Sequence, residues 1–241
     1  MENSLSVILS RQSVLGRQMN TIATNLANIN TAGFKAEELL YKEVPERTTR
    51  NGERLSLVHD VTYLRDMSEG QMSKTDNTFD LAISGNGFFV VNTAQGERYT
   101  RHGAFSLNNQ GQLVTLTGAP VLGEGNAPIL VPPGTVNVTI TADGTISADS
   151  QQIGKVQVVE FDQPSALVKE GDSLYRAQDQ APRPAAESRV QQGMIEGSNV
   201  KSVAEMTRMI EVARSYQSAA RMAEAEHERI RNAINIIVGK N

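Results

Sequence analysis

The stretch LSVILSRQSVLGRQMNTIATNLANI, residues 5–29, sets the pattern on which the rest of the chain depends. Its apolar residues recur at alternating gaps of three and four with Gln12 as the one exception, and they are Leu5, Ile8, Leu15, Met19, Ile22, Leu26 and Ile29. Such a stripe is typical of a coiled-coil seam, which is narrower than the buried face of an ordinary globular helix. The pattern therefore predicts a helix that needs a partner helix of the same period.

The C-terminal end of the chain carries a second stripe with the same alternating gaps. Its members are Met206, Met209, Ala213, Tyr216, Ala220, Ala223, His227, Ile230, Ile234 and Ile237. The alanines in the middle of this stripe have small side chains, and small side chains let the backbone of a second helix come close. We expect the two ends of the chain to be helices that pack against each other or against copies of themselves.

Between the two ends the period changes to that of β-strands, with short apolar runs separated by turn residues. The dipeptide Asn86-Gly87 between two apolar runs predicts a hairpin, residues 153–161 form the longest predicted strand, and residues 190–193 are a candidate last edge strand. The predicted fold is α+β, with long N- and C-terminal helices in a coiled-coil-like layer and a central antiparallel β domain.

We divide the chain into five parts on this basis. They are an N-terminal helix and motif (1–35), an extended connector (36–75), the central β domain (76–176), a connector with an edge strand (177–198) and the C-terminal helix (199–241).

Composition narrows the range of functions. The 241 residues carry a net charge of -4 without any basic block, so we expect no nucleic-acid partner. Hydropathy is low throughout, so we expect no membrane-embedded segment, and the first fifteen residues lack the apolar run of a signal peptide. The absence of cysteine excludes disulfides and thiolate metal sites.

The search for chemistry yields no candidate catalytic, cofactor or metal residues. The histidines His59, His102 and His227 lie far apart in the sequence, and no nucleophile and base are spaced as a triad. The paired glycines belong to predicted hairpins, so they do not form a phosphate-binding loop. We expect a protein that is not an enzyme and takes no cofactor.

Four motifs give the chain its resemblance to a known family. They are NLANINTAGFK at 25–35, DLAI at 80–83 with GFFVV at 87–91, YTRHG at 99–103 with GQLV at 111–114, and EGSNV at 196–200 followed by EMT at 205–207. In this order they resemble the flagellar axial family of rod and hook proteins. The length, the short region after Lys35 and the run TADGTIS at 141–147 are most similar to the proximal rod subunits of that family. A distal rod protein or another axial subunit is the alternative.

The resemblance implies a structural subunit of the basal-body rod in the periplasm, polymerising through its terminal helices into a torque-transmitting drive shaft. It also implies export through the flagellar type III apparatus and contacts with proximal and distal rod subunits. The expected assembly residues at the N-terminal end are Leu5, Ile8, Leu15, Met19, Ile22, Asn25, Leu26, Asn28, Ile29, Thr31, Gly33 and Phe34. At the C-terminal end they are Ser198, Asn199, Val200, Met206, Met209, Ala213, Tyr216, Ala220, Ala223, Ile230, Ile234 and Ile237.

Two other readings stay open at this point. In one, the protein is a monomer whose two helices pair only with each other beside a β domain. In the other, it is a secreted hydrolase, whose sign would be a deep polar pocket with a perturbed carboxylate or histidine.

Overall fold

The computed structural model describes residues 2–47 and 54–238, with side chains described for 5–41 and 62–236. The chain divides into two compact units. The first, the helical unit, consists of Met1–Ala27, Glu37–Arg65 and Lys201–Asn241. The second, the β unit, consists of Asn28–Ala36 and Asp66–Val200.

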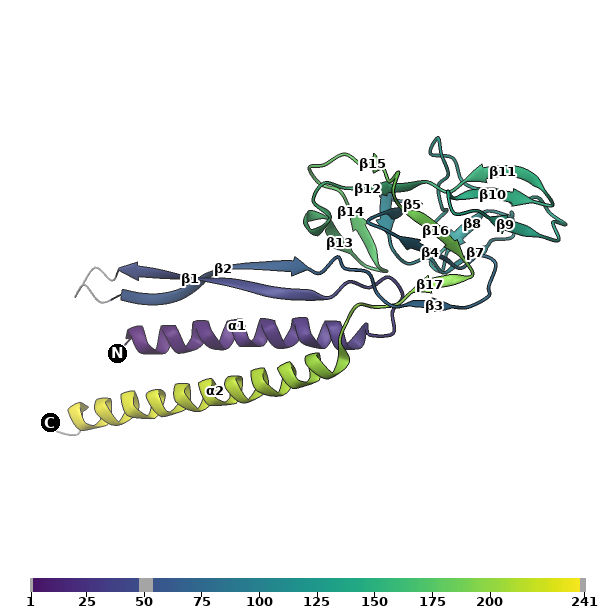
Figure 1. The fold of residues 1–241 in the computed structure, drawn as a ribbon. Coiled ribbons are helices and arrows are strands. Elements are labelled where there is room, and N and C mark those ends of the chain that lie inside the picture. Colours follow the sequence, from purple (N-terminus) through teal and green to yellow (C-terminus); the bar gives the residue numbers. More distant parts are fainter. Residues whose placement is uncertain (1, 48–53, 239–241) are drawn as a thin grey trace. The chain divides into compact units, whose positions relative to one another are not determined.

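The helical unit contains two long helices and one hairpin. Helix α1 (Glu2–Ala27) and helix α2 (Ser202–Val238) run side by side in opposite directions, and the hairpin of β1 (Glu37–Arg47) and β2 (Arg54–Arg65) lies along α1 (Figure 1). The two helices that the sequence predicts are thus present, and the α+β class is confirmed.

The hairpin lies within the segment 36–75, for which the sequence predicts an extended connector. The two strands pair in antiparallel register from Glu37 opposite Arg65 to Arg47 opposite Arg54, with an irregularity between Lys42 and Glu43. At its base, Arg65 Nη2 lies 3.0 Å from Glu37 Oε1. At the start of β1, Leu39 is buried, whereas Leu40 and Tyr41 are exposed, so apolar side chains there do not mark a single buried face.

Helix α1 is buried over a wider face than its apolar stripe predicts. Val14, Thr21, Ile22 and Asn25 are all buried, and Val14, Thr21 and Asn25 lie beside the stripe rather than on it. The reason is that α1 has two neighbours in its own chain, α2 on one side and the hairpin on another (Figure 1). A helix that packs against neighbours on two sides buries a wider face than a helix that contacts one partner along a coiled-coil seam.

Helix α2 buries a row of residues at heptad steps, namely Glu205, Val212 and Ala219. This row is displaced by one residue from part of the predicted stripe, in which Met206 is exposed while Ala213 and Ala220 are half-buried. Met209, Tyr216 and Ala223, which belong to the predicted stripe, are half-buried beside the row. One edge of the predicted stripe therefore faces into the helical unit and the other faces outward.

The β unit is built from short antiparallel strands. They are β3 (Met72–Lys74), β4 (Leu81–Ser84), β5 (Phe88–Thr93), β6 (Gly96–Thr100), β7 (Phe105–Leu107), β8 (Leu113–Thr115), β9 (Val138–Ile140), β10 (Thr145–Ala148), β11 (Gln151–Lys155), β12 (Val158–Glu160), β13 (Val168–Glu170), β14 (Leu174–Arg176), β15 (Arg183–Pro184), β16 (Arg189–Gln192) and β17 (Met194–Glu196), with a short 3-10 helix at Pro164–Ala166. The largest sheet has the order β13-β14-β6-β5-β12-β15, and β11-β10-β9 form a second sheet. The pairs β16-β4, β17-β3 and β7-β8 complete the unit.

Strand β5 lies at the centre because it is buried on both faces. Phe89 and Val91 join one hydrophobic core with Leu81 and Ile83, while Phe88 and Val90 join a second core with Tyr99 and Tyr175. Side chains alternate between the faces of a strand, so a run without polar residues is expected where both faces are covered. The sequence FFVV at 88–91 is such a run.

Two local predictions in this unit were wrong and one is confirmed. Asn86-Gly87 does not close a hairpin, because β4 pairs with β16 while β5 pairs with β6 and β12. A Cβ on Gly87 would lie 2.4 Å from Val158 Cγ1, so this glycine serves close packing where the chain changes sheets. The long strand predicted at 153–161 is broken into β11 and β12. The last edge strand is present as β16.

Candidate assembly interface

The N-terminal motif continues beyond α1 as a tight loop in the β unit. Gly33 has a left-handed backbone with φ of 65°, and a Cβ on it would lie 2.5 Å from the backbone carbon of Arg101. Glycine is thus required here for both conformation and space. Phe34 is buried, and Lys169 Nζ lies 4.1 Å from the centre of its ring.

The structure brings the N-terminal and C-terminal motifs together within the β unit. The Gly33 amide donates to the Glu196 carbonyl at 2.8 Å, and the Asn199 amide donates to the Phe34 carbonyl at 3.4 Å. The Asn199 side chain accepts from the Ala36 amide at 2.7 Å and donates to the Asp66 carbonyl at 2.9 Å. The two motifs therefore form one paired structure, which the sequence reasoning did not foresee.

A buried cluster of charges holds this pairing. Glu196 Oε1 lies 2.5 Å from Lys35 Nζ, and Glu196 Oε2 lies 3.0 Å from Arg101 Nε as an ion pair without hydrogen-bond alignment. The Gly70 amide also donates to Glu196 Oε1, at 3.0 Å. All three charged side chains are almost fully buried. Burial lowers the pKa of Lys35, and the neighbouring carboxylate of Glu196 opposes that shift.

Sequence reasoning placed none of these three residues at the interface. Lys35 is the last residue of the N-terminal motif, and Glu196 is the first residue of the C-terminal motif. Their opposite charges at the edges of two motifs were the signal from which a pairing could have been predicted. Arg101 lies inside the central motif YTRHG, so no spacing rule relates it to the other two. Only the folded chain shows that they share a site.

Asn25, a predicted interface residue, is fully used within the helical unit. Its side chain donates to the Glu37 carbonyl at 2.8 Å and accepts from the Glu37 amide at 3.0 Å. Its amide nitrogen also lies 3.4 Å from Glu205 Oε2. A buried amide with partners on both its oxygen and nitrogen fixes the start of β1 against the end of α1.

The other predicted residues fall into three groups of exposure. Ile22 and Val200 are buried. The half-buried group comprises Leu5, Ile8, Leu15, Met19, Leu26, Asn28, Ile29, Thr31, Ser198, Met209, Ala213, Tyr216, Ala220, Ala223 and Ile230. Met206 and Ile234 are about half exposed, at 50% and 53%. The side chain of Ile237 lies outside the described residues.

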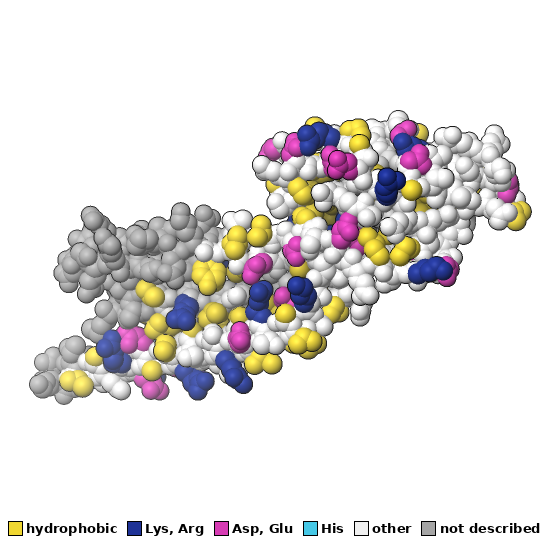
Figure 2. Space-filling view, in the orientation of Figure 1, with side chains coloured by type: hydrophobic (Ala, Val, Ile, Leu, Met, Phe, Trp, Pro, Cys, Tyr) yellow, Lys and Arg dark blue, Asp and Glu magenta, His cyan; other side chains and the backbone are white. Residues whose placement is uncertain are grey.

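Helix α2 presents a set of exposed apolar side chains. They are Val203, Met206, Ile210, Met222, Ile234 and Ile236. Figure 2 shows apolar side chains interspersed with Lys, Arg, Asp and Glu side chains along the helices. At about 100° per residue these six side chains point to several sides of the helix, so they do not form one continuous apolar face.

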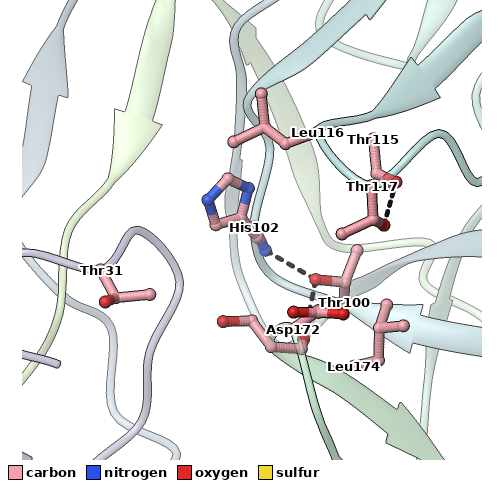
Figure 3. Close-up of a pocket in the computed structure, with 9 residues that line it drawn as sticks. Thr31, Thr100, His102, Thr115, Leu116, Thr117, Asp172 and Leu174 are labelled. Carbon is pink, nitrogen blue, oxygen red and sulfur yellow. Dashed lines mark hydrogen bonds between the residues drawn. The ribbon is translucent and has the colours of Figure 1, made fainter.

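A small cavity in the β unit is lined by several hydroxyl groups, one histidine and one aspartate. It encloses about 170 Å³ between Thr31, Thr100, His102, Leu116 and Asp172, with Thr115, Thr117, Ser173 and Leu174 completing its lining (Figure 3). The His102 amide donates to Thr100 Oγ1, which donates to the Ser173 carbonyl. Burial lowers the pKa of His102. Ligand pockets are typically 300–1,000 Å³, so this cavity is smaller than an ordinary substrate site. A second hollow in the β unit has about 540 Å³, and Glu124, Asp143 and Lys155 are among the residues that line it.

Two further findings concern metals and membranes. Among the described residues, no three His, Asp or Glu side chains gather as metal ligands. Within the same part of the chain, neither long helix is apolar enough to cross a bilayer.

Comparison with known proteins decides the family. The models "Flagella basal body rod protein", "Flagellar hook protein FlgE/F/G D1 domain" and "Flagellar basal body rod FlgEFG protein C-terminal" match residues 5–35, 82–148 and 191–236. The flagellar basal-body rod protein FlgF of Caulobacter vibrioides is 41% identical over 97% of this chain and 97% of its own length. The chain belongs to the flagellar basal-body rod protein family.

Other members of the rod family show where in it this chain falls. FlgF of Mesorhizobium japonicum is 36% identical over 91% of both chains. FlgG of Buchnera aphidicola subsp. Schizaphis graminum is 34% identical, over 83% of this chain and 86% of its own. The chain is a structural rod subunit of the flagellar basal body, and its similarity to the FlgF proteins is the greater.

Proposed function

We propose that this rod subunit polymerises through α1 and α2, and that the packed helical layer is the part of the shaft that transmits torque. The observation that carries the proposal is the apolar series along α2. Val212 and Ala219 are its buried members, whereas apolar side chains before and after them are exposed, among them Met222, Ile234 and Ile236. Neighbouring helices in an assembly would cover these side chains.

The lengths of the helices support the same proposal. Helix α2 has 37 residues and α1 has 26. At 1.5 Å per residue the difference is about 16 Å of helix, so α2 extends well past its partner in the same chain. A coiled-coil-like layer of helices from several subunits would bury this overhang. A shaft built this way uses heterologous contacts that do not close into a ring, and its close-packed interior resists compression.

The proposal extends to partners and compartment. Its neighbours are other rod subunits, both proximal and distal, and the chain reaches the periplasm through the flagellar type III export apparatus. These statements rest on membership of the rod family together with the sequence resemblance. Placement in the proximal rod rests on the greater similarity to FlgF, with a distal position as the alternative.

The five-part division of the chain and the full set of interface residues stay predictions. The division differs from the two compact units at one important place. Residues 28–35 belong to the β unit, although the division assigns them to the N-terminal helix segment.

The test replaces an exposed apolar residue on the overhang of α2. Ile234 is 53% exposed, so Ile234→Asp leaves the folding of the free chain unchanged. In an assembly that covers this residue, a buried aspartate without a partner blocks packing. We expect normal export, no incorporation into isolated basal bodies and no swimming. The matched control is Glu228→Gln, an exposed change on the same helix. Normal incorporation of Ile234→Asp would refute assembly through the end of α2.

A further inference from the structure

We propose that Glu196 acts as a register latch: with Lys35 and Arg101 it selects the one alignment in which the two terminal motifs pair, and rod assembly depends on that alignment. The inference rests on the proposed function, because assembly is one of its readouts. It goes further by giving a positioning role to three residues outside the predicted interface.

Two close backbone contacts at glycines flank the pairing of the two motifs. A Cβ on Gly70 would lie 1.9 Å from the Gly197 carbonyl oxygen, and a Cβ on Gly33 would lie 2.5 Å from the Arg101 backbone. Glycines allow this close approach. Because they carry no side chains, they provide no packing that would distinguish one register from the next.

The strand pair beside this contact is also too short to fix its own register. Strands β3 and β17 pair over three residues, with Met194 opposite Lys74 and Glu196 opposite Met72. A slip of one residue turns each side chain to the opposite face, and short strands with polar residues resist such slips weakly. The Asn199 side-chain bonds to Ala36 and Asp66 and the pairing of the adjoining β16 with β4 contribute to the alignment, and the buried charges add a further constraint.

The cations are held in place by groups other than Glu196. Lys35 Nζ donates to the Ser68 carbonyl at 2.6 Å, and Arg101 Nη1 donates to the carbonyls of Gly85 and Gly87 at 2.8 and 2.6 Å. Lys35 of the N-terminal motif and Arg101 of the central motif thus form a positively charged binding site for a carboxylate. Glu196 is the anion that arrives with the C-terminal motif.

The energetics of buried charges make this arrangement selective. An intact buried ion pair adds little stability compared with apolar residues of the same size, whereas removing one partner is strongly destabilising. In a slipped pairing Glu196 leaves the site, and Lys35 and Arg101 lose the carboxylate that contacts both of them. The carboxylate of Glu69, which also attracts Lys35, accepts from the Gly85 amide instead. The cluster therefore penalises wrong registers more than it stabilises the right one.

The experiment uses the full chain with the double substitution Lys35→Met and Glu196→Gln. This change removes one charge of each sign, keeps side-chain volume and leaves an amide oxygen for Gly70 and Arg101. Because Arg101 keeps its charge while its anion is removed, we expect a lower melting temperature than that of the parent chain, with unfolding that stays cooperative. We expect hydrogen exchange at the amides of Gly33 and Gly197 to rise by more than about tenfold. These amides bond across the pairing, to the carbonyls of Glu196 and Gln71. Swimming should be lost.

The matched control removes an exposed ion pair near the same strand. Lys74 Nζ lies 2.8 Å from Asp76 Oδ1, with both side chains more than 70% exposed. Lys74→Met with Asp76→Asn changes the same charges at the surface. We expect parent values for melting, exchange and swimming.

Any other outcome of the experiment refutes the proposed role of Glu196 in setting the register. If the double variant swims and its amides exchange as in the parent, the ion pair does not set the register. If the variant loses the cooperative unfolding of the β unit, the cluster is a stabilising core element instead. Ile234→Asp separates these results from the proposed function. Normal swimming of that variant refutes assembly through α2, whatever the double variant does.

Discussion

Single residues in this chain are specified by backbone geometry as much as by apolar contact. Gly33 combines a φ of 65° with a close approach to Arg101, and Asn25 and Asn199 each bond to backbone groups at several points. An alanine at any of these positions would leave a strained backbone or an unpaired polar group. Gly33 therefore permits a backbone conformation and a close contact, and Asn25 and Asn199 provide hydrogen bonds to the backbone.

Gly33→Ala should destabilise the β unit through strain and collision together. A non-glycine residue in a left-handed conformation costs about 1–3 kcal/mol, and the contact with Arg101 adds to this. Urea unfolding measures the loss. The control is Gly118→Ala, where φ is 86° but the space around the added Cβ is open. A loss no greater than that of the control would show that the loop at Gly33 can move aside.

His102 gives the β unit a dependence on pH. Burial lowers its pKa below 6.5 in the folded chain. Between the folded and unfolded pKa values the unfolded chain binds more protons, so stability falls as the pH drops below about 6.5. Glu170, whose pKa is lowered by its hydrogen bond with Arg98, acts in a separate window below 4.5.

The measurement compares melting temperatures at pH 7 and pH 5 for the parent chain and for His102→Gln. The parent should lose more stability on acidification than the variant, which lacks the titrating ring. Equal losses in the two chains would show that His102 does not contribute to this slope.

At the scale of elements, α2 has two faces with different partners. Ala219 is buried within the helical unit, while its neighbour Ala220 is half-buried. Adjacent residues on a helix point about 100° apart, so a change at each position tests a different contact. The first contact exists in the single chain and the second belongs to the proposed assembly.

Leucine substitutions at these two positions should therefore act differently. Ala219→Leu overpacks the contact within the chain and should lower stability by about 1–3 kcal/mol. Ala220→Leu should leave the melting temperature of the free chain unchanged and weaken or abolish swimming. Calorimetry and a motility assay measure the two effects, with the exposed change Glu211→Gln as the control. Normal swimming by Ala220→Leu at normal export would mean that the outer face of α2 is loosely packed.

At the scale of the whole molecule, the β unit has the cores and the motif pairing that an independent domain needs. Its two hydrophobic cores draw all their members from the β unit, and the loop of 28–36 is tied to it through Gly33 and Lys35. The helical unit takes its three segments from both ends of the chain and from the hairpin. Removing α1 should therefore affect the two units unequally.

Deletion of residues 1–27 should abolish rod assembly and leave the β unit folded. The boundary matters, because a deletion reaching Lys35 would also remove one cation of the buried cluster. Near-ultraviolet circular dichroism reports the tyrosine packing of the β unit, and secretion is assayed separately from assembly. A truncated chain that still enters basal bodies would show that α1 is not an assembly element.

The sequence by itself determined the two helices, the β character of the middle and the family. Each of these follows from signals between near neighbours: the three-and-four spacing of residues 5–29, the short apolar runs between turns, and motifs read in order. Local period fixes secondary structure because side chains three, four or two residues apart share a face whatever the distant chain does.

Only the tertiary structure decided which elements cover one another. The packing of the β1–β2 hairpin along α1, the pairing of β4 with β16, and the meeting of Lys35, Arg101 and Glu196 all join segments far apart in the chain. No spacing rule predicts such contacts, because they depend on which distant groups are desolvated together. Charges in particular reveal their partners only there, since a buried charge is tolerated where an opposite charge and hydrogen-bonding groups surround it.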